Sequence, residues 1–407
     1  MTKVIAFYLP QFHDIPENDE WWGKGFTEWT NVKAAHPLFE GHEQPRVPLG
    51  NKYYNLLDDT VKVWQAKIAR EHGIYGFCYY HYWFGGKMLL QKPMEQMLAN
   101  KNIDIPFCVC WANEPWTKAW VNETKVLIPQ KYGDESEWKR HFDYLLPFLL
   151  DERYITEDGC PLVVIYRPEV IPRLNEMLSL WNSLAVEKGL PGLVFAYQQV
   201  VRDWAGGSDE AFRYHIEYQP SIAMMRSLGM LPSSLSPFEN RSHALRALKN
   251  RVSTVVEKAL GIDVSQKLAS LRKAGRDAPQ LFDYDELWSQ ILNNPPLTEK
   301  SIPGAFVDWD NTPRKGVKGD VVLGGTPEKF ERYFSELLEK SRREYGSPFV
   351  FVNAWNEWAE GTYLEPDETW GLGYLKAIRS ALNQQIAYDC SRDESSKNLL
   401  GEKGYDE

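Results

Sequence analysis

Eight short, apolar, β-rich runs recur along the chain, with longer helical patterns between most of them. Each run is short enough to be one strand and apolar enough to be buried on both faces, as parallel strands in α/β folds are. The runs are Val4–Leu9, Gly76–Tyr80, Phe107–Trp111, Leu162–Tyr166, Leu193–Tyr197, His215–Tyr218, Ala305–Asp308 and Phe349–Trp355. Eight such units in series predict an α/β fold of the (β/α)8, or TIM, barrel type.

The segments between these strands carry apolar residues three and four positions apart, as on one face of a helix. They are Asp59–His72, Gln91–Asn100, Glu135–Leu150, Glu169–Lys188, Pro327–Arg343 and Leu372–Leu382. Two connections exceed the usual βα loop: an aromatic loop over 10–58 and a segment over 219–303 with a helical insertion at about 236–293. We expect one domain over 1–387, with the first loop as a wall over the barrel mouth, and a polar tail over 388–407.

The charge balance argues against nucleic acid as a partner. The 407 residues include 46 Lys and Arg against 56 Asp and Glu, and the net charge of −10 opposes binding to phosphates. No stretch approaches the roughly 18 consecutive apolar residues of a membrane span, and the first ten residues lack a signal-peptide pattern, so we expect a cytoplasmic location. The five cysteines have no zinc or redox spacing, and we interpret them as buried free thiols.

Aromatic and polar residues gather where the predicted strands end. The chain contains 16 Trp, 21 Tyr and 18 Phe, and they cluster with Asn, Glu, Asp and His instead of spreading through apolar runs. In a barrel of this type the carboxyl ends of the strands build the active site. Aromatic faces beside carboxylates and amides suit a sugar ring, whose C–H faces stack while its hydroxyls need hydrogen-bonding partners.

These residues, three of them from the aromatic loop, form the predicted binding site for a carbohydrate. They are Tyr8, Gln11, Glu28, Trp29, His81, Tyr82, Trp83, Trp111, Asn113, Glu114, Trp116, Tyr218, Asp308, Trp309, Asp310, Arg314, Asn356 and Trp358.

Glu357 and Glu360 are the candidate catalytic carboxylates, because cleavage of a glycosidic bond usually requires two. If the turn after strand eight is helical, their Cβ atoms lie about 5–6 Å apart, which favours the retaining geometry over the inverting one. The neighbouring Trp355 and Trp358 would desolvate a carboxyl group and raise its pKa. The alternative is that both glutamates only stabilise the amino end of a helix.

Glu114 and His81 each allow more than one interpretation. Glu114 lies in an Asn-Glu-Pro sequence at a strand end, where it could bind substrate, act as the catalytic acid or form a structural ion pair. His81 could donate a hydrogen bond to substrate or to a carboxylate, or it could be an ordinary core histidine.

Six segments of the chain resemble the WbsX-type family. They are AFYLPQFH at 6–13, NDEWWGKGFTEWTNV at 18–32, GFCYYHYWF at 76–84, FCVCWANEPWT at 107–117, DWDNTPR at 308–314 and FVNAWNEWAEGTYLEPD at 351–367. The family comprises glycosyltransferases of O-antigen and other surface-polysaccharide loci and is related to glycoside hydrolase family 99. The likeness extends to about Leu382 and implies the same (β/α)8 fold.

The resemblance also implies roles for the two glutamates. In the family 99 hydrolases a Glu-Trp-x-Glu-Gly turn holds both catalytic carboxylates, and this chain has it as Glu357 to Gly361. Glu360 would protonate the leaving oxygen, and Glu357 would deprotonate the sugar 2-hydroxyl. The implied reaction is endo-acting and retaining, on α-mannoside-like bonds, through a 1,2-anhydro sugar. Ala359 stands where the hydrolases commonly have His, so neither that substrate contact nor mannose specificity is implied here.

Three functions remain open at this point. The first is a retaining glycosidase or transglycosylase that acts on a bacterial surface polysaccharide or its lipid-linked precursor. The second is a nucleotide-sugar glycosyltransferase of O-antigen or capsule synthesis, although the sequence has no glycine-rich phosphate loop and only an isolated Asp308-Trp309-Asp310 triplet. The third is a glycan-binding barrel without catalysis. For the first function we predict no metal and no cofactor.

A basic segment within the predicted insertion raises the possibility of membrane contact. Residues 239–277 hold nine Lys or Arg and four acids, and Leu245, Leu248, Val252 and Val255 recur at helical spacing. An amphipathic basic helix can lie on an anionic membrane, here the inner leaflet. The alternative is that the apolar stripe packs on the barrel and the charges face water.

Overall fold

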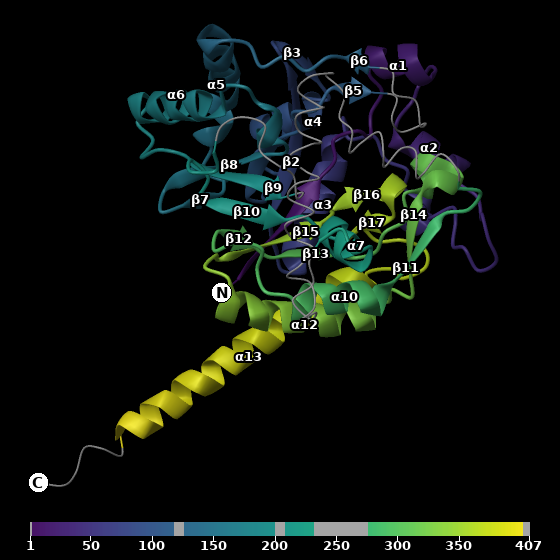
Figure 1. Cartoon of the computed structure of the whole chain (residues 1–407), viewed down its shortest axis with the longest axis vertical. Coiled ribbons are helices and arrows are strands. Elements are labelled where there is room, and N and C mark those ends of the chain that lie inside the picture. The colour runs from purple at the N-terminus through teal and green to yellow at the C-terminus, as the bar shows by residue number, and fades with distance from the viewer. Residues whose placement is uncertain (1, 118–125, 200–207, 232–275, 402–407) are drawn as a thin grey trace, which may run out of the picture.

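The structure is a computed structural model that describes residues 2–117, 126–199, 208–231 and 276–401, with side chains of the last helix described up to residue 387. Its centre is a parallel barrel of short strands surrounded by helices, as the sequence predicts (Figure 1). Around the barrel the strands run in the order β12, β10, β9, β8, β4, β2, β1, β15, β13. Their bounds are β1 Lys3–Tyr8, β2 Ile74–Phe84, β4 Phe107–Trp111, β8 Cys160–Ile165, β9 Val194–Gln199, β10 Tyr214–Glu217, β12 Ser301–Ile302, β13 Gly304–Phe306 and β15 Phe349–Asn353.

The barrel closes through one short stretch of chain, residues 301–306. β12 pairs with β10 on one side, and β13 pairs with β15 on the other. Pro303 interrupts this stretch, and its carbonyl oxygen accepts a hydrogen bond from the Phe351 amide at 3.1 Å. The two pieces together therefore serve as the seventh of the eight predicted strands.

The helices follow the predicted patterns because their apolar faces cover the barrel. They are α3 Asp59–Glu71, α4 Lys92–Ala99, α5 Glu135–Leu149, α6 Leu174–Glu187, α7 Ser221–Ser227, α10 Tyr284–Asn293, α12 Pro327–Glu344 and α13 Gly373–Gly401. Several begin at a side chain that caps the first turn. Asp134 accepts hydrogen bonds from the Ser136 and Glu137 amides at the start of α5, and Thr326 accepts one from Lys329 at the start of α12.

The aromatic loop after β1 is folded. It contains α1 (Pro16–Trp22), α2 (Glu28–Ala34) and the 3₁₀ turn η1 (Leu49–Asn51). α2 lies against the turn that follows β15, where Trp29 contacts Trp358 at 5.4 Å between ring centroids. The loop is thus part of the wall at the carboxyl end of the barrel.

Short elements complete the connections between the barrel strands and the outer helices. They are β3 Lys87–Leu89, β5 Trp116–Thr117, β6 Val126–Ile128, β7 Thr156–Glu157, η3 Pro168–Val170, β11 Gln280–Asp283, α11 Thr312–Lys315, η5 Gly316–Lys318, β14 Asp320–Leu323, β16 Asn356–Glu357, η6 Trp358–Glu360 and β17 Thr362–Tyr363.

The structure differs from the sequence prediction in two segments. Within the predicted helical insertion, 280–283 is strand β11, because it pairs with β14 about forty residues later, which no local pattern reveals. α13 continues to Gly401 and projects from the barrel, so most of the predicted tail over 388–407 is helical (Figure 1). Most of the basic segment 239–277 lies outside the described residues, as does the rest of the predicted insertion before residue 276.

Candidate active site

A cleft of about 440 Å³ opens where the barrel strands end. Eight residues that the sequence predicts for the site line it: Tyr82, Glu114, Trp116, Tyr218, Trp309, Arg314, Glu357 and Glu360. The lining also includes residues that the sequence analysis missed: Leu9, Tyr80, Ala112, Pro115, Thr117, Tyr166, Ser221, Met224, Asn311, Lys315 and Asp320. Most of these are immediate neighbours of predicted residues, so nearness to the motifs was the available signal.

Glu357 and Glu360 lie on a tight turn between β16 and β17. Glu357 ends β16, and Glu360 ends the 3₁₀ turn η6. Gly361 follows with a φ of 65°, and a Cβ at this position would lie 2.7 Å from the Asp310 amide nitrogen. The turn is a 3₁₀ helix and not the α-helix that the spacing argument assumed, so the two carboxylates do not share an α-helix face.

Arg314 brings the two carboxylates together instead. Its Nη1 donates to Glu360 Oε1 at 2.6 Å, and its Nη2 donates to Glu357 Oε2 at 2.9 Å. The same guanidinium binds a third carboxylate, Glu28, with Nε and Nη2 at 3.1 and 3.0 Å from Oε2. Two predicted substrate contacts, Arg314 and Glu28, thus belong to a charged cluster with both catalytic candidates.

Burial raises the pKa of two carboxyl groups in this cluster, Glu357 and Glu28. It raises the pKa of Glu357 to about 8; Arg314 opposes the effect, and the charges of Glu360 and Glu28 add to it. The pKa of Glu28 is also raised by burial. At neutral pH the raised pKa favours the protonated form of Glu357 in the ligand-free protein, so the site holds a proton donor.

Glu365 is a buried carboxylate that the sequence analysis did not single out. Four side chains donate to it: Trp355 at 3.1 Å, Trp358 at 2.6 Å, Tyr54 at 2.7 Å and Gln65 at 2.6 Å. Burial raises its pKa to about 7, against these hydrogen bonds. Glu365 therefore holds the two tryptophans that were expected to desolvate the catalytic pair, and with them the turn.

Strand alternation separates the residues of β2 into two groups. Tyr80 and Tyr82 line the cleft. His81 and Trp83 point to the opposite side and pack against His141 of α5, with His81 Nε2 2.9 Å from His141 Nε2. Burial lowers the pKa of His81 to about 3. His81 is consequently a neutral core histidine, and neither it nor Trp83 is brought to the cleft.

Other predicted residues lie in the walls behind the cleft. The Trp111 indole donates to the Trp83 carbonyl at 3.2 Å, and Tyr8 donates to Gln65 at 2.7 Å. The Asn356 side chain bonds both backbone groups of Leu9, at 2.8 and 2.9 Å, which ties the turn to β1. Trp29, Trp358 and Gln11 are also buried outside the cleft lining. These residues support the site and do not face it.

Glu114 lines the cleft and also forms an ion pair. Arg167 Nη1 lies 2.6 Å from its Oε1, and the side chain of Glu114 is 38% exposed. Asn113 holds the Arg167 backbone on both sides, accepting from its amide at 2.7 Å and donating to its carbonyl at 2.6 Å. Asn113 is thus a support, and Glu114 keeps an accessible face toward the cleft.

The two aspartates of the Asp308-Trp309-Asp310 triplet bind other side chains of the protein. Arg46 lies 2.7 Å from Asp308. Asp310 accepts from Gln44 at 2.6 Å, from Thr312 at 2.6 Å, and from His42 at 2.7 Å. Because carboxylates engaged in this way have few lone pairs left, the triplet is poorly suited to hold a metal-bound diphosphate.

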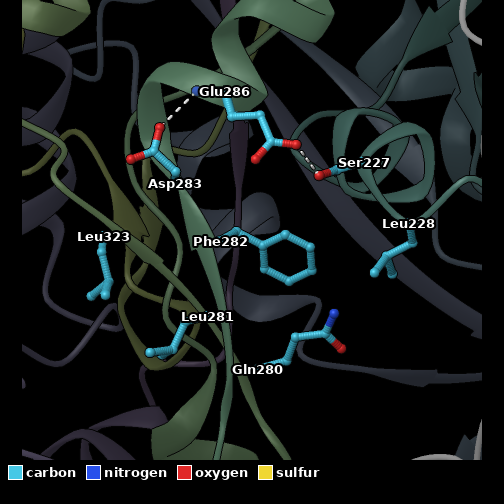
Figure 2. Close-up of a pocket in the computed structure, with 8 residues that line it drawn as sticks. All are labelled: Ser227, Leu228, Gln280, Leu281, Phe282, Asp283, Glu286 and Leu323. Atoms are coloured by element: carbon cyan, nitrogen blue, oxygen red, sulfur yellow. Dashed lines mark hydrogen bonds between the residues drawn. The ribbon is translucent and has the colours of Figure 1, made fainter.

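Figure 2 shows a second pocket, of about 430 Å³, at the end of α7 and along β11. Its polar groups bond each other: Ser227 donates to Glu286, and Asp283 accepts from the Glu286 amide at 2.8 Å. Its apolar wall is made by Leu228, Leu281, Phe282 and Leu323. It contains none of the residues predicted for the site, so the first cleft is the candidate site.

No group of three or more His, Cys, Asp or Glu side chains in the described part could hold a metal ion. No helix there is both long enough and apolar enough to cross a membrane. Cys78, Cys108 and Cys110 are free and buried, as predicted, and Cys160 is free and partly buried.

A barrel with aromatic faces and buried carboxylates at its mouth is the architecture of an enzyme that acts on glycosidic bonds. The chain belongs to the family described as Glycosyltransferase WbsX, whose model matches residues 4–378. It is 33% identical over 386 residues to the uncharacterized protein WxcX of Xanthomonas campestris pv. campestris strain B100, with 94% of this chain and 50% of that protein covered. The chain spans about half the length of this relative.

Solved structures show the same fold at low sequence identity. A glycoside hydrolase-like protein has a TM-score of 0.52 at 13% identity, with 93% of each chain covered. The GH99 endo-alpha-mannosidase from Bacteroides thetaiotaomicron has a TM-score of 0.50 at 12% identity, with 95% of this chain and 98% of that chain covered. These likenesses confirm the predicted barrel.

Proposed function

We propose that the protein is a retaining, endo-acting glycosidase or transglycosylase that acts on a surface polysaccharide or its lipid-linked precursor. The observation that carries this proposal is the cluster at the cleft: Glu357 and Glu360 both line it and both bind Arg314. The aromatic lining of Tyr80, Tyr82 and Trp116 supports a sugar ligand. The family relationship supports a polysaccharide.

In the proposed reaction, Glu357 removes the proton of a sugar 2-hydroxyl, and that oxygen attacks the anomeric carbon to form a 1,2-anhydro sugar. Glu360 gives its proton to the leaving oxygen as the glycosidic bond breaks. Water or an acceptor hydroxyl then opens the anhydro ring, losing its proton to Glu360 while Glu357 returns one to the 2-oxygen. Configuration is retained because two displacements occur at one carbon.

The ligand-free protein holds its proton on Glu357, whereas this reaction needs it on Glu360. The side chain of Glu360 is the more exposed of the two, at 19% against 7% for Glu357. In the proposed reaction the proton is therefore on Glu360 once substrate is bound, and the two carboxylates share the Arg314 guanidinium.

The test is product analysis on bacterial surface polysaccharides and lipid-linked oligosaccharides with Glu357→Gln and Glu360→Gln. Each variant should lose turnover by at least about 10²-fold while it still binds the glycan, because the amides keep the shape but cannot exchange the proton. The first-formed product should have the anomeric configuration of the substrate, as followed by NMR. Full turnover in Glu360→Gln would remove the pair from catalysis.

A nucleotide-sugar glycosyltransferase is the second candidate, favoured by the description of the family. It predicts consumption of a nucleotide-sugar donor, activity lost in EDTA and activity restored by Mn²⁺. The glycosidase predicts turnover of a glycan without any donor, unchanged by chelation.

A further inference from the structure

We propose that Arg314 and Glu28 are positioning residues that align Glu357 and Glu360 and set the pH range in which these two carboxyl groups work. This inference rests on the proposed function. It concerns two charged residues that the sequence predicts as substrate contacts.

The two residues come from elements far apart in the sequence. Arg314 lies on α11, which follows β13, and Glu28 is the first residue of α2 in the aromatic loop. Glu28 is fully buried and does not line the cleft, so it reaches a substrate only through Arg314. Arg314 uses Nη1 for Glu360, Nη2 for Glu357, and Nε together with Nη2 for Glu28. A single planar guanidinium therefore fixes three carboxylates relative to one another.

The charges of this cluster do not balance. One guanidinium faces three carboxylates, so full ionisation would leave two negative charges in excess in a poorly solvated place, and burial opposes that state. Tyr80, Tyr82 and Tyr218 also face the cluster, but burial holds each pKa well above its ordinary value, so they stay neutral. Farther along the cleft lie three more charged side chains, Lys315, Glu114 and Asp320.

Each member of the pair should influence the catalytic carboxyl groups in the opposite direction. Glu28 contributes a negative charge, which makes Glu357 and Glu360 harder to ionise. Arg314 contributes a positive charge, which makes them easier to ionise. Removing Glu28 should thus move the working range to lower pH, and removing Arg314 should move it to higher pH.

The experiment measures kcat and KM across pH 4–10 for wild type, Glu28→Gln, Arg314→Gln and Arg314→Lys. For Glu28→Gln we expect both limbs of the kcat/KM profile to move down by about one pH unit, with kcat reduced and KM nearly unchanged. For Arg314→Gln we expect both limbs to move up, and Arg314→Lys should restore part of the shift because it restores the charge. Glu20→Gln is the control, an exposed carboxylate of the same loop.

A purely structural role would lower kcat without moving the limbs. If Glu28→Gln folds and its limbs stay in place, the inference is overturned, whatever its activity. If Arg314→Gln does not fold, Arg314→Lys and Glu28→Gln still decide it. If Glu357→Gln and Glu360→Gln keep full turnover, it is the proposed function that fails.

If wild type turns over no glycan, thermal unfolding replaces kinetics. The folded protein loses stability as pH rises from about 4.5 to 8 when it contains carboxyl groups with a raised pKa. Between these pH values the folded state binds more protons than the unfolded state. Glu28→Gln should flatten this loss. An unchanged slope would contradict the role of Glu28 in the cluster.

Discussion

At the scale of single residues, Glu114 and Glu360 are distinguished by their partners. Glu114 has the Asn-Glu-Pro context of a catalytic acid, yet its carboxylate is held by Arg167, which in turn lies 2.7 Å from Glu169. Glu360 shares its guanidinium with two other carboxylates. Glu360 shares Arg314 with a second carboxylate of the cleft, Glu357, whereas Glu114 shares Arg167 with Glu169, which does not line the cleft, so we interpret Glu114 as a substrate contact.

We predict that Glu114→Gln raises KM by about 5- to 30-fold and changes kcat little, because each lost charged hydrogen bond to a sugar hydroxyl costs about 1–2 kcal/mol. Steady-state kinetics on the glycan that wild type cleaves would measure this. Glu169→Gln is the matched control, since it loosens Arg167 without touching the cleft lining. A large fall in kcat with unchanged KM would instead make Glu114 the catalytic acid.

Among the single residues of the candidate site, the sequence motifs predict some positions and not others. The motifs predict Glu357, Glu360, Arg314 and Glu114 for the site, and the structure places all four in the lining of the cleft. They do not reveal that Arg314 joins three carboxylates, because Glu28 is 286 positions away in the chain. Strand alternation was the missed signal for His81 and Trp83, which share β2 with the cleft residues Tyr80 and Tyr82 but face α5.

At the scale of elements, Glu365 links the turn that carries Glu357 and Glu360 to α3 and the aromatic loop. Its Oε1 accepts from Gln65 and Trp355, and its Oε2 accepts from Tyr54 and Trp358. Both oxygens thus need to be acceptors. A glutamine at position 365 would place its own N–H donors against two of these four donors.

We predict that Glu365→Gln lowers the free energy of unfolding at pH 6 by about 1–3 kcal/mol, since buried donors lose their acceptor. The burial that raises its pKa to about 7 makes wild-type stability fall as pH rises from about 4.3 to 7, and the variant should lack that part of the slope. Chemical denaturation at several pH values measures both effects. Glu368→Gln, an exposed neighbour, should change neither.

The contact between β2 and α5 has the opposite pH dependence. Burial lowers the pKa of His81 to about 3 and holds that of His141 well below its ordinary value. Below about pH 6.5 these histidines bind protons in the unfolded chain but not in the folded protein, so stability is lost as pH falls. For His81 alone this amounts to about 2 kcal/mol at pH 5.

We predict that the double variant His81→Phe, His141→Phe is close to wild type in stability at pH 7.5 and more stable than wild type at pH 5. Replacing both partners by rings of similar shape leaves neither nitrogen unpaired. Calorimetric unfolding at the two pH values checks this. The exposed His36→Asn should show the wild-type difference, and a double variant that shows it too would contradict the assignment.

At the scale of the whole molecule, the eight apolar runs predict the barrel because each has the composition of a strand buried on both faces. They do not reveal how it closes, since Ser301–Phe306 is divided between β10 and β15 by Pro303. The closure depends on a close backbone approach at Gly304. A Cβ built at this residue would lie 1.8 Å from the carbonyl oxygen of Glu217, and 3.3 Å from the Gln219 side chain.

We predict that Gly304→Ala destabilises the protein by about 3 kcal/mol or more and abolishes glycan binding along with turnover. The backbone oxygen of Glu217 cannot move away without breaking the pairing of β10, so the methyl group forces β13 and β10 apart, an overpacking strain within a close-packed core. Denaturant unfolding gives the free energy, and glycan binding reports on the cleft. Gly346→Ala is the matched control, because it is exposed and an added Cβ there meets nothing within 4 Å. It should leave both unchanged, whereas equal stability of Gly304→Ala and wild type would show that residues 301–306 do not close the barrel so tightly.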